Sequence, residues 1–245
     1  SFETRFESNS MSSFNIARIK LATEKIRFNV YAGYKSAAEY QIPDGEFVKN
    51  SSYNRKSLKA SLGYNKNNWI LNLRYNYNSN ENGLPGHTHS LNPSPDEFLL
   101  ETQHRERILP LQLIEDHYLS IENKLILSNQ SVIKLNTGFT SNSITEFEEK
   151  VTIPGISMLL NNIPYNFSFT SYVNKNIKWI SGIQGMLTKN SNDESAESSL
   201  IPNASSYDIG SYSLLQYSKS QFETQIGLRY DIREIDAGDL LSKNF

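Results

Sequence analysis

The chain has 245 residues and carries 24 Lys and Arg side chains against 26 Asp and Glu, which gives a formal net charge of -2. That balance excludes the basic excess of a nucleic-acid-binding protein, and the lack of cysteine excludes disulfide scaffolds, thiolate zinc sites and cysteine nucleophiles. No apolar run approaches the roughly 20 residues that a membrane-spanning helix needs, and the mean hydropathy of -0.52 is that of an ordinary water-soluble protein.

Apolar and polar residues alternate along most of the chain, which predicts β-strands because successive strand side chains point to opposite faces. We expect an all-β chain of about eleven strands that pair antiparallel in chain order, as an up-and-down meander. In order, the predicted strands are 1–8, 14–21, 26–34, 55–64, 68–78, 118–127, 132–142, 158–172, 177–187, 207–217 and 221–233.

The alternation predicts a sheet with one apolar and one polar wall. In the last strand the apolar side carries Phe222, Thr224, Ile226, Leu228, Tyr230 and Ile232. The other side carries Glu223, Gln225, Gly227, Arg229, Asp231 and Arg233. Leu71, Leu73 and Tyr217 are expected on the apolar wall, and Asn72 and Arg74 on the polar wall. A membrane barrel fits a low mean hydropathy, because only every second strand residue faces lipid.

The predicted connections alternate in length. Short polar turns are expected at 22–25, 65–67, 128–131, 174–176 and 218–220, and long connections at 35–51, 79–117, 143–157 and 188–206. Short turns at one end and long loops at the other are typical of outer-membrane barrels. Soluble sandwiches do not show this regular alternation.

Aromatic residues lie where two membrane interfaces would fall. Trp69, Trp179 and Phe222 follow short turns, whereas Tyr34, Tyr53, Tyr75, Tyr77, Tyr118 and Tyr207 lie beside the long connections. Outer-membrane barrels carry aromatic girdles at both interfaces. The alternative is that these residues are simply good strand formers.

Several short motifs resemble TonB-dependent outer-membrane receptors, particularly those of Bacteroidota. They follow the family's order: NGLPGHTH at 82–89, LQLIEDH at 111–117, ITEFEE at 144–149, LIPN at 200–203, DIG at 208–210 and GLRYD at 227–231. The resemblance covers most of the chain, from about Tyr31 to Asp231. Thr145 stands where this family usually has Arg.

The resemblance implies part of a larger barrel, because a barrel of this family has about 22 strands. We expect residues 1–245 to be a partial outer-membrane barrel, without the N-terminal plug and the remaining strands, and Phe245 to be a fragment boundary. The implied partners are outer-membrane lipid, the plug domain of the same polypeptide, TonB, and a small solute or metal chelate; no nucleic acid is expected. The implied function is energised uptake of a scarce solute, such as a siderophore or another iron complex.

The candidate ligand-binding residues lie in the longest predicted connection, which holds all four histidines. They are His87, His89, His104, Arg105 and Arg107. Two imidazoles two residues apart can share a metal ion, but the histidines could equally belong to a solvated polar loop, and no metal site or cofactor is predicted. The candidate lumen-facing residues are Arg74, Glu223, Arg229 and Asp231.

Two other functional classes stay open: a soluble or surface-attached β-sandwich that binds glycans, and a passive porin-like channel. An enzyme is not expected, because the serines show no nucleophile elbow. Gly83, Pro85 and Gly86 indicate a turn and do not match a phosphate-binding loop.

Overall fold

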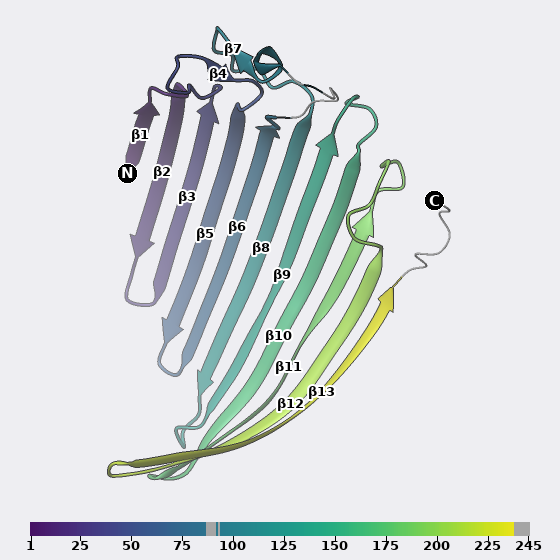
Figure 1. Ribbon diagram of the computed structural model, residues 1–245. Coiled ribbons are helices and arrows are strands. Elements are labelled where there is room, and N and C mark those ends of the chain that lie inside the picture. Colours follow the sequence, from purple (N-terminus) through teal and green to yellow (C-terminus); the bar gives the residue numbers. More distant parts are fainter. Residues whose placement is uncertain (87–91, 93, 238–245) are drawn as a thin grey trace.

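The computed structural model describes residues 1–86, 92 and 94–237. Eleven strands form one antiparallel sheet in which each strand pairs only with its neighbours in chain order (Figure 1). They are β1 (Phe2–Glu7), β2 (Ser12–Ala22), β3 (Ile26–Ala37), β5 (Tyr53–Lys66), β6 (Trp69–Gly83), β8 (Leu111–Ile126), β9 (Val132–Phe147), β10 (Ile156–Asn174), β11 (Ile177–Asn192), β12 (Ala204–Lys219) and β13 (Phe222–Ala237). The predicted all-β meander of about eleven strands is confirmed.

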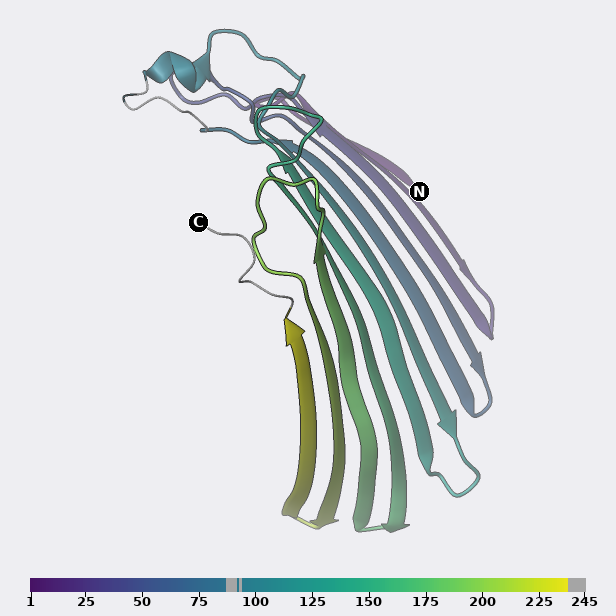
Figure 2. The ribbon, with the colours of Figure 1, turned by 90° about the vertical axis from the view of Figure 1, so that its right-hand side faces the viewer.

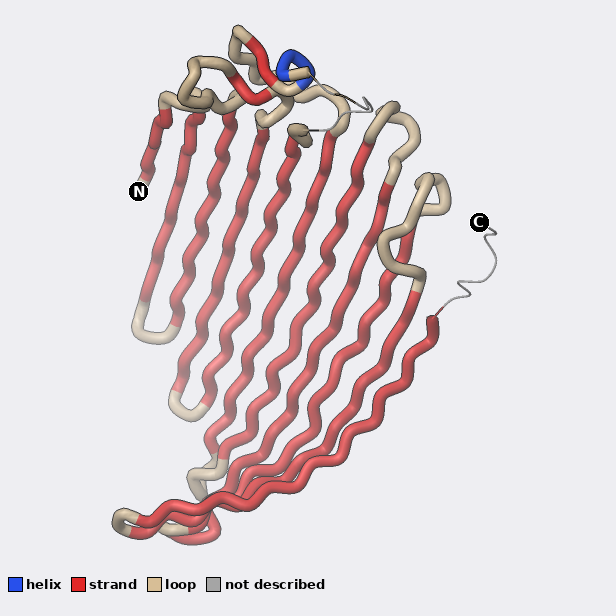
Figure 3. The backbone as a smooth tube through the Cα atoms, viewed as in Figure 1, coloured by secondary structure: helices blue, strands red, loops and turns tan. Residues whose placement is uncertain are grey.

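The remaining elements lie in the connections at one rim. They are β4 (Phe47–Val48), β7 (Leu99–Leu100) and the short 3-10 helix η1 (Pro95–Glu97); β4 and β7 pair with each other. Figure 3 shows the short turns gathered at the opposite rim, as predicted. Within the described residues, no helix has the length and apolar character needed to cross a membrane.

Some of the short turns contain a residue at positive φ. Asn67 and Ser220 have φ of 50° and 55°, which suits the tight hairpins between β5 and β6 and between β12 and β13. In the turn from β10 to β11, the Asn174 side chain accepts from the backbone N–H groups of Asn176 and Ile177 at 2.9 and 3.0 Å. Local side-chain hydrogen bonds of this kind stabilise the turn.

The sheet is a single curved layer (Figure 2). Only Ile16, Ala37 and Ala38 are buried hydrophobic residues among those described, whereas Leu228 is 79% and Ile226 70% exposed. A β-sandwich would place a second sheet against one face and bury such residues. The single layer therefore excludes the sandwich alternative for this chain.

The two walls are confirmed by the register. Leu228 is paired with Ser213 and Arg229 with Tyr212, so these neighbours occupy opposite faces. Pairing carries the apolar face without a break from β13 to β1. It includes Phe2, Ile19, Leu21, Phe28, Leu62, Leu71, Leu73, Leu119, Ile121, Leu135, Phe139, Ile163, Phe167, Ile183, Leu215, Tyr217, Ile226 and Leu228.

The strands extend further towards the long-loop rim than their alternation predicts. The expected connection 79–117 shortens to 84–110, because 79–83 pair with 111–115. Similarly, β12 begins at Ala204 and β13 runs to Ala237. Beyond an apolar band about 25 Å tall, both faces of a barrel strand meet water, so the alternation fades while pairing continues. Connection length also alternates less strictly than expected, since only 8–11 join β1 to β2 at this rim.

Candidate functional site

The connection between β6 and β8 spans residues 84–110, and its described part folds back over the rim of the first strands. Gln103 donates from Nε2 to the Asn9 carbonyl at 3.1 Å. Arg105 donates to the Met11 carbonyl at 2.6 Å and to the Ser36 hydroxyl at 3.1 Å. In Figure 1 this segment, with β7, lies above the ends of the first strands. We call residues 84–110 the rim loop; through Gln103 and Arg105 its described part is fixed to strands distant in sequence.

A buried carboxylate holds the rim loop against the connection from β3 to β5. Glu39 is 2% exposed, and its two oxygens accept from the backbone N–H groups of Asn50 at 2.6 Å and His104 at 3.0 Å. The Glu39 N–H donates in turn to the His104 carbonyl at 3.0 Å. A buried carboxylate is stable only when its oxygens receive such hydrogen bonds.

Asn50 holds the two ends of the rim loop. Its Nδ2 donates to the Leu84 carbonyl at 3.4 Å at one end and to the Pro110 carbonyl at 2.8 Å at the other, where its Oδ1 also accepts from the Ile108 N–H at 3.2 Å. Asn50 has a φ of 59°, in the left-handed region that Asn tolerates better than most residues. A Cβ at Gly83 would overlap the backbone and side-chain oxygens of Asn50, so glycine is needed there. This contact gives the first glycine of the NGLPG motif a structural role.

Glu39 and Asn50 were not found by the sequence reasoning. Neither lies in an alternating segment, and an acid or an Asn in a polar connection ordinarily indicates a solvated loop. The only signal in the sequence was Gly83. A position that requires glycine indicates a close backbone contact, but it does not identify the residue in contact.

The predicted ligand residues divide into two groups. His87 and His89 lie outside the described residues. His104 Nε2 is 3.1 Å from the Thr102 hydroxyl, Arg105 is fixed to the rim, and Arg107 Nε lies 3.1 Å from Glu81 Oε1. These three described residues therefore make contacts within the chain that hold the rim loop in place. Within the described part of the chain, no group of three or more His, Cys, Asp or Glu residues is arranged to hold a metal ion.

His117, the fourth histidine, lies apart from the rim loop. It is on β8 and pairs with Tyr77, on the apolar face. Its Nδ1 is 2.8 Å from the Tyr75 hydroxyl, and Tyr77 donates to Glu115 at 2.7 Å. This cluster places polar groups at the loop end of the apolar face. Girdle residues suit such a position, because they combine an apolar ring with a polar tip.

The connection from β11 to β12, residues 193–203, is also fastened by asparagine. Asn190 donates to the Pro202 carbonyl at 2.9 Å, and Asn203 accepts from the Asn192 N–H at 2.7 Å. Asn203 is the last residue of the LIPN motif, which thus closes this connection. At its start, hydrogen bonds from the Ser195 hydroxyl and backbone N–H hold the pKa of Asp193 below its ordinary value.

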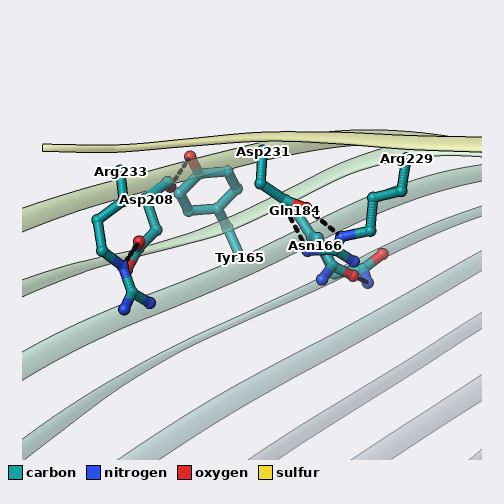
Figure 4. A network of polar contacts seen from close by, with 7 residues as sticks. All are labelled: Tyr165, Asn166, Gln184, Asp208, Arg229, Asp231 and Arg233. Atoms are coloured by element: carbon teal, nitrogen blue, oxygen red, sulfur yellow. Dashed lines mark hydrogen bonds and ion pairs between the residues drawn. The ribbon is translucent and has the colours of Figure 1, made fainter.

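The polar face carries a network of charged residues across β10 to β13 (Figure 4). Arg229 forms a two-pronged contact with Asp231, with both N–O distances at 2.6 Å, and Arg233 pairs with Asp208. With its amide oxygen turned towards Arg229, Gln184 accepts from both terminal nitrogens at 2.6 and 2.8 Å. A hollow of about 500 Å³ adjoins these residues, and Gly210 leaves room for the Asp231 and Arg229 side chains. Each cation here has its own carboxylate.

All four predicted lumen-facing residues lie on this polar face. Arg74 pairs with Glu122 at 2.6 Å, while Glu223, Arg229 and Asp231 follow one another along β13. That the polar face encloses a lumen stays a prediction.

Charge is distributed unevenly over the polar face. From β1 to β6 the register places there the cations Arg5, Arg18, Lys20, Arg27, Lys35, Arg55, Lys59 and Arg74, against the carboxylates Glu3 and Glu7. From β8 to β13 the polar face carries Lys124, Lys134, Lys178, Arg229 and Arg233 against Asp116, Glu122, Glu146, Asp208, Glu223 and Asp231. One half of the polar face is therefore strongly basic and the other is close to neutral.

Comparisons with known proteins identify the fold. No family model and no curated protein matches the chain. Among solved structures it is similar to the FrpB iron transporter from Neisseria meningitidis, F3-3 variant, with a TM-score of 0.70 at 12% identity. It is also similar to the F5-1 variant in its apoprotein form, with a TM-score of 0.69 at 14% identity. Each match covers 95% of this chain but only 39% of the solved protein. At this identity the likeness shows a shared outer-membrane barrel fold.

Proposed function

We propose that this chain forms part of the barrel of a TonB-dependent outer-membrane receptor. The observation that carries the proposal is the unbroken apolar face of a single-layer meander whose fold matches an iron transporter. A single sheet with an exposed apolar face is stable where lipid covers that face. The finer placement among Bacteroidota receptors rests on the sequence motifs alone.

The proposed receptor takes up a scarce solute, such as a siderophore or another chelate, through a polar lumen. The solved neighbours are transporters, which supports transport over catalysis. In this proposal residues 1–245 supply part of the barrel, and a plug domain of the same polypeptide and TonB act with it. Arg74, Glu223, Arg229 and Asp231 face the lumen and contact the plug or the solute.

We assign solute capture to the rim loop. Long structured loops on a rigid scaffold tend to carry binding residues. Arg105 and Arg107 support this assignment indirectly, because their contacts hold the loop over the rim. His87 and His89 are the candidates for direct contact with a metal chelate, and His104 lies where the loop joins Glu39.

The test measures energised uptake in cells that carry or lack the gene. Cells with the gene are expected to accumulate the chelated iron from a panel of siderophores, and collapsing the proton-motive force should abolish that accumulation. Uptake that continues without the proton-motive force would identify a passive porin-like channel instead. Outer-membrane fractionation of the same cells checks the location, and recovery of the full-length protein in the soluble fraction would contradict the proposal.

A further inference from the structure

A small hollow lies within the basic half of the polar face, across β2, β3, β5 and β6. It has a volume of about 230 Å³. Its floor is formed by two short side chains, Asn29 and Ser61, and Asn29 Nδ2 donates to the Ser61 hydroxyl at 3.1 Å. Because both floor residues are small and polar, the hollow offers hydrogen-bonding groups at its base.

Four cations surround this floor. Strand pairing places Lys20, Asn29, Ser61 and Arg74 side by side in one row, so a cation stands at each end of it. The adjacent row contains Arg18 and Lys59, one on each side of Tyr31. Rows two residues apart along a strand are separated by about 7 Å, and neighbouring strands by about 5 Å. Among the described residues, no carboxylate lines the hollow.

Two of these cations lie close to the aromatic ring of Tyr31. The Arg18 Cζ lies 5.6 Å and the Lys59 Nζ 5.8 Å from the ring centroid. A tyrosine ring attracts each cation, but two like charges near one ring repel each other. An anion within reach of both cations reduces this repulsion.

Counter-charges within the described chain reach only the margins of the hollow. Arg74 pairs with Glu122 at 2.6 Å, and Arg18 lies 3.8 Å from Glu3. Within the described residues, Lys20 and Lys59 form no ion pair at 4 Å or less. The positive charge over the floor is therefore only partly neutralised, in contrast to the one-to-one pairs around Arg229 and Arg233.

We propose that this hollow is a binding site for an oxyanion, that is, a carboxylate or phosphate group held between Lys20, Lys59, Arg18 and Arg74. Lysine ammonium groups attract an anion as point charges, and arginine offers paired N–H donors that match two anionic oxygens. The anion has two possible sources, a molecule from solution or an acidic side chain that covers the sheet. The site follows from the chain's own charges and does not depend on a role in uptake.

The first experiment measures binding of inorganic phosphate and of citrate to the full-length protein in detergent, by calorimetry in about 0.1 M salt. The test variant is Lys20→Gln with Lys59→Gln, because these exposed lysines have no described carboxylate to leave unpaired. The matched control is Lys124→Gln with Lys134→Gln, a cross-strand pair on the same polar face that removes the same charge. We expect the test variant to bind at least tenfold more weakly and the control to be unchanged, since screening limits a charge's effect to about 10 Å at 0.1 M salt.

The second experiment asks whether an acidic side chain of the same polypeptide already fills the site. A carbodiimide joins a lysine to a carboxylate only when the two are in contact, and mass spectrometry locates the link. A link from Lys20 or Lys59 to an acidic residue outside this sheet, lost in the double variant, identifies an internal carboxylate. Phosphate or citrate binding that depends on these lysines identifies an anion from solution. The proposal is overturned if no such crosslink forms and phosphate and citrate bind the test variant as they bind the wild type.

Discussion

Trp69 and Asn123 are neighbours on the apolar face, and the indole Nε1 of Trp69 donates to Asn123 Oδ1 at 2.9 Å. Both lie near the short-turn rim, where Trp69 also meets Tyr64 edge-on with ring centroids 5.2 Å apart. The hydrogen bond gives a partner to an amide that stands between Ile121 and Leu125 along this wall. The Trp69 side chain has an apolar ring body and a polar N–H, and Asn123 supplies the polar partner that this N–H needs.

This contact predicts energetic coupling between the two residues. Trp69→Phe is expected to lower the free energy of unfolding by about 1–2 kcal/mol, because the Asn123 amide loses its donor. In an Asn123→Leu background the same change should cost clearly less. Urea unfolding of the full-length protein in lipid vesicles measures the double-mutant cycle, and strictly additive effects would show that the bond contributes nothing.

The apolar face predicts that a lysine substitution in β13 lowers the free energy of unfolding much more on the apolar face than on the polar face. Leu228→Lys should lower the free energy of unfolding by about 2–4 kcal/mol if the residue faces mid-membrane lipid. Gln225→Lys, on the polar face of the same strand, should change it by less than about 1 kcal/mol. Equal effects in the same vesicle unfolding assay would count against lipid contact on this wall.

Glu39 is predicted to keep the rim loop closed. Glu39→Ala leaves the N–H groups of Asn50 and His104 without their acceptor, at about 1–3 kcal/mol for each buried donor. Amide hydrogen exchange in residues 94–110 should accelerate by about tenfold or more, while the strands stay protected. Asp44→Ala, an exposed acid in the same connection, is the control. Unchanged amide exchange in residues 94–110 of the Glu39 variant would show that Glu39 does not keep the rim loop closed.

The two glycines that flank the start of the rim loop should respond differently to alanine. Gly83→Ala is expected to displace Asn50, because the new Cβ would overlap its oxygens, and to cost more than about 2 kcal/mol. Gly86 has a φ of 78°, and no described atom lies within 4 Å of the place that a Cβ would take. Gly86→Ala should therefore cost only about 1 kcal/mol, from backbone strain. Thermal unfolding of the two variants decides whether this order is right.

Anchoring of the rim loop is predicted to matter for capture rather than for folding. Gln103→Ala with Arg105→Ala removes the contacts to Asn9, Met11, Ser36 and the Glu39 carbonyl, while no residue of the paired strands is changed. Solute affinity should fall about tenfold as the loop loses its fixed position, with unfolding of the barrel unchanged. If affinity is unaffected while proteolysis of the loop increases, capture belongs to another part of the protein.

The side-chain pattern predicted the sheet well because pleating alone determines which residues share a wall. Leu71 and Leu228 were placed correctly for that reason, and the turn near Asn67 through the short polar run that separates two alternating segments. The strand ends beyond Asn78 were not predicted, because both faces there are hydrated and the period-2 signal disappears.

The rim could not be read from the sequence, because its contacts join distant polar residues. Glu39 is bonded to His104, and Asn50 to Pro110, with nothing in the intervening composition to mark either pair. Arg105 and Arg107 were selected for their charge as candidate ligand residues, and the structure shows them in contacts within the chain. The face that a strand residue occupies follows from its position in the local sequence. The partner of a loop side chain depends on the tertiary fold.

The rim loop also has a consequence for the order of assembly. Every strand of the sheet joins its predecessor in the chain, so the sheet can grow hairpin by hairpin with short loops to close. The bonds from Gln103 to Asn9 and from Arg105 to Met11 each span 94 residues. The end of the first hairpin therefore gains its cover only after β3, β5 and β6 have been added, and until then it stays open to chaperones and proteases.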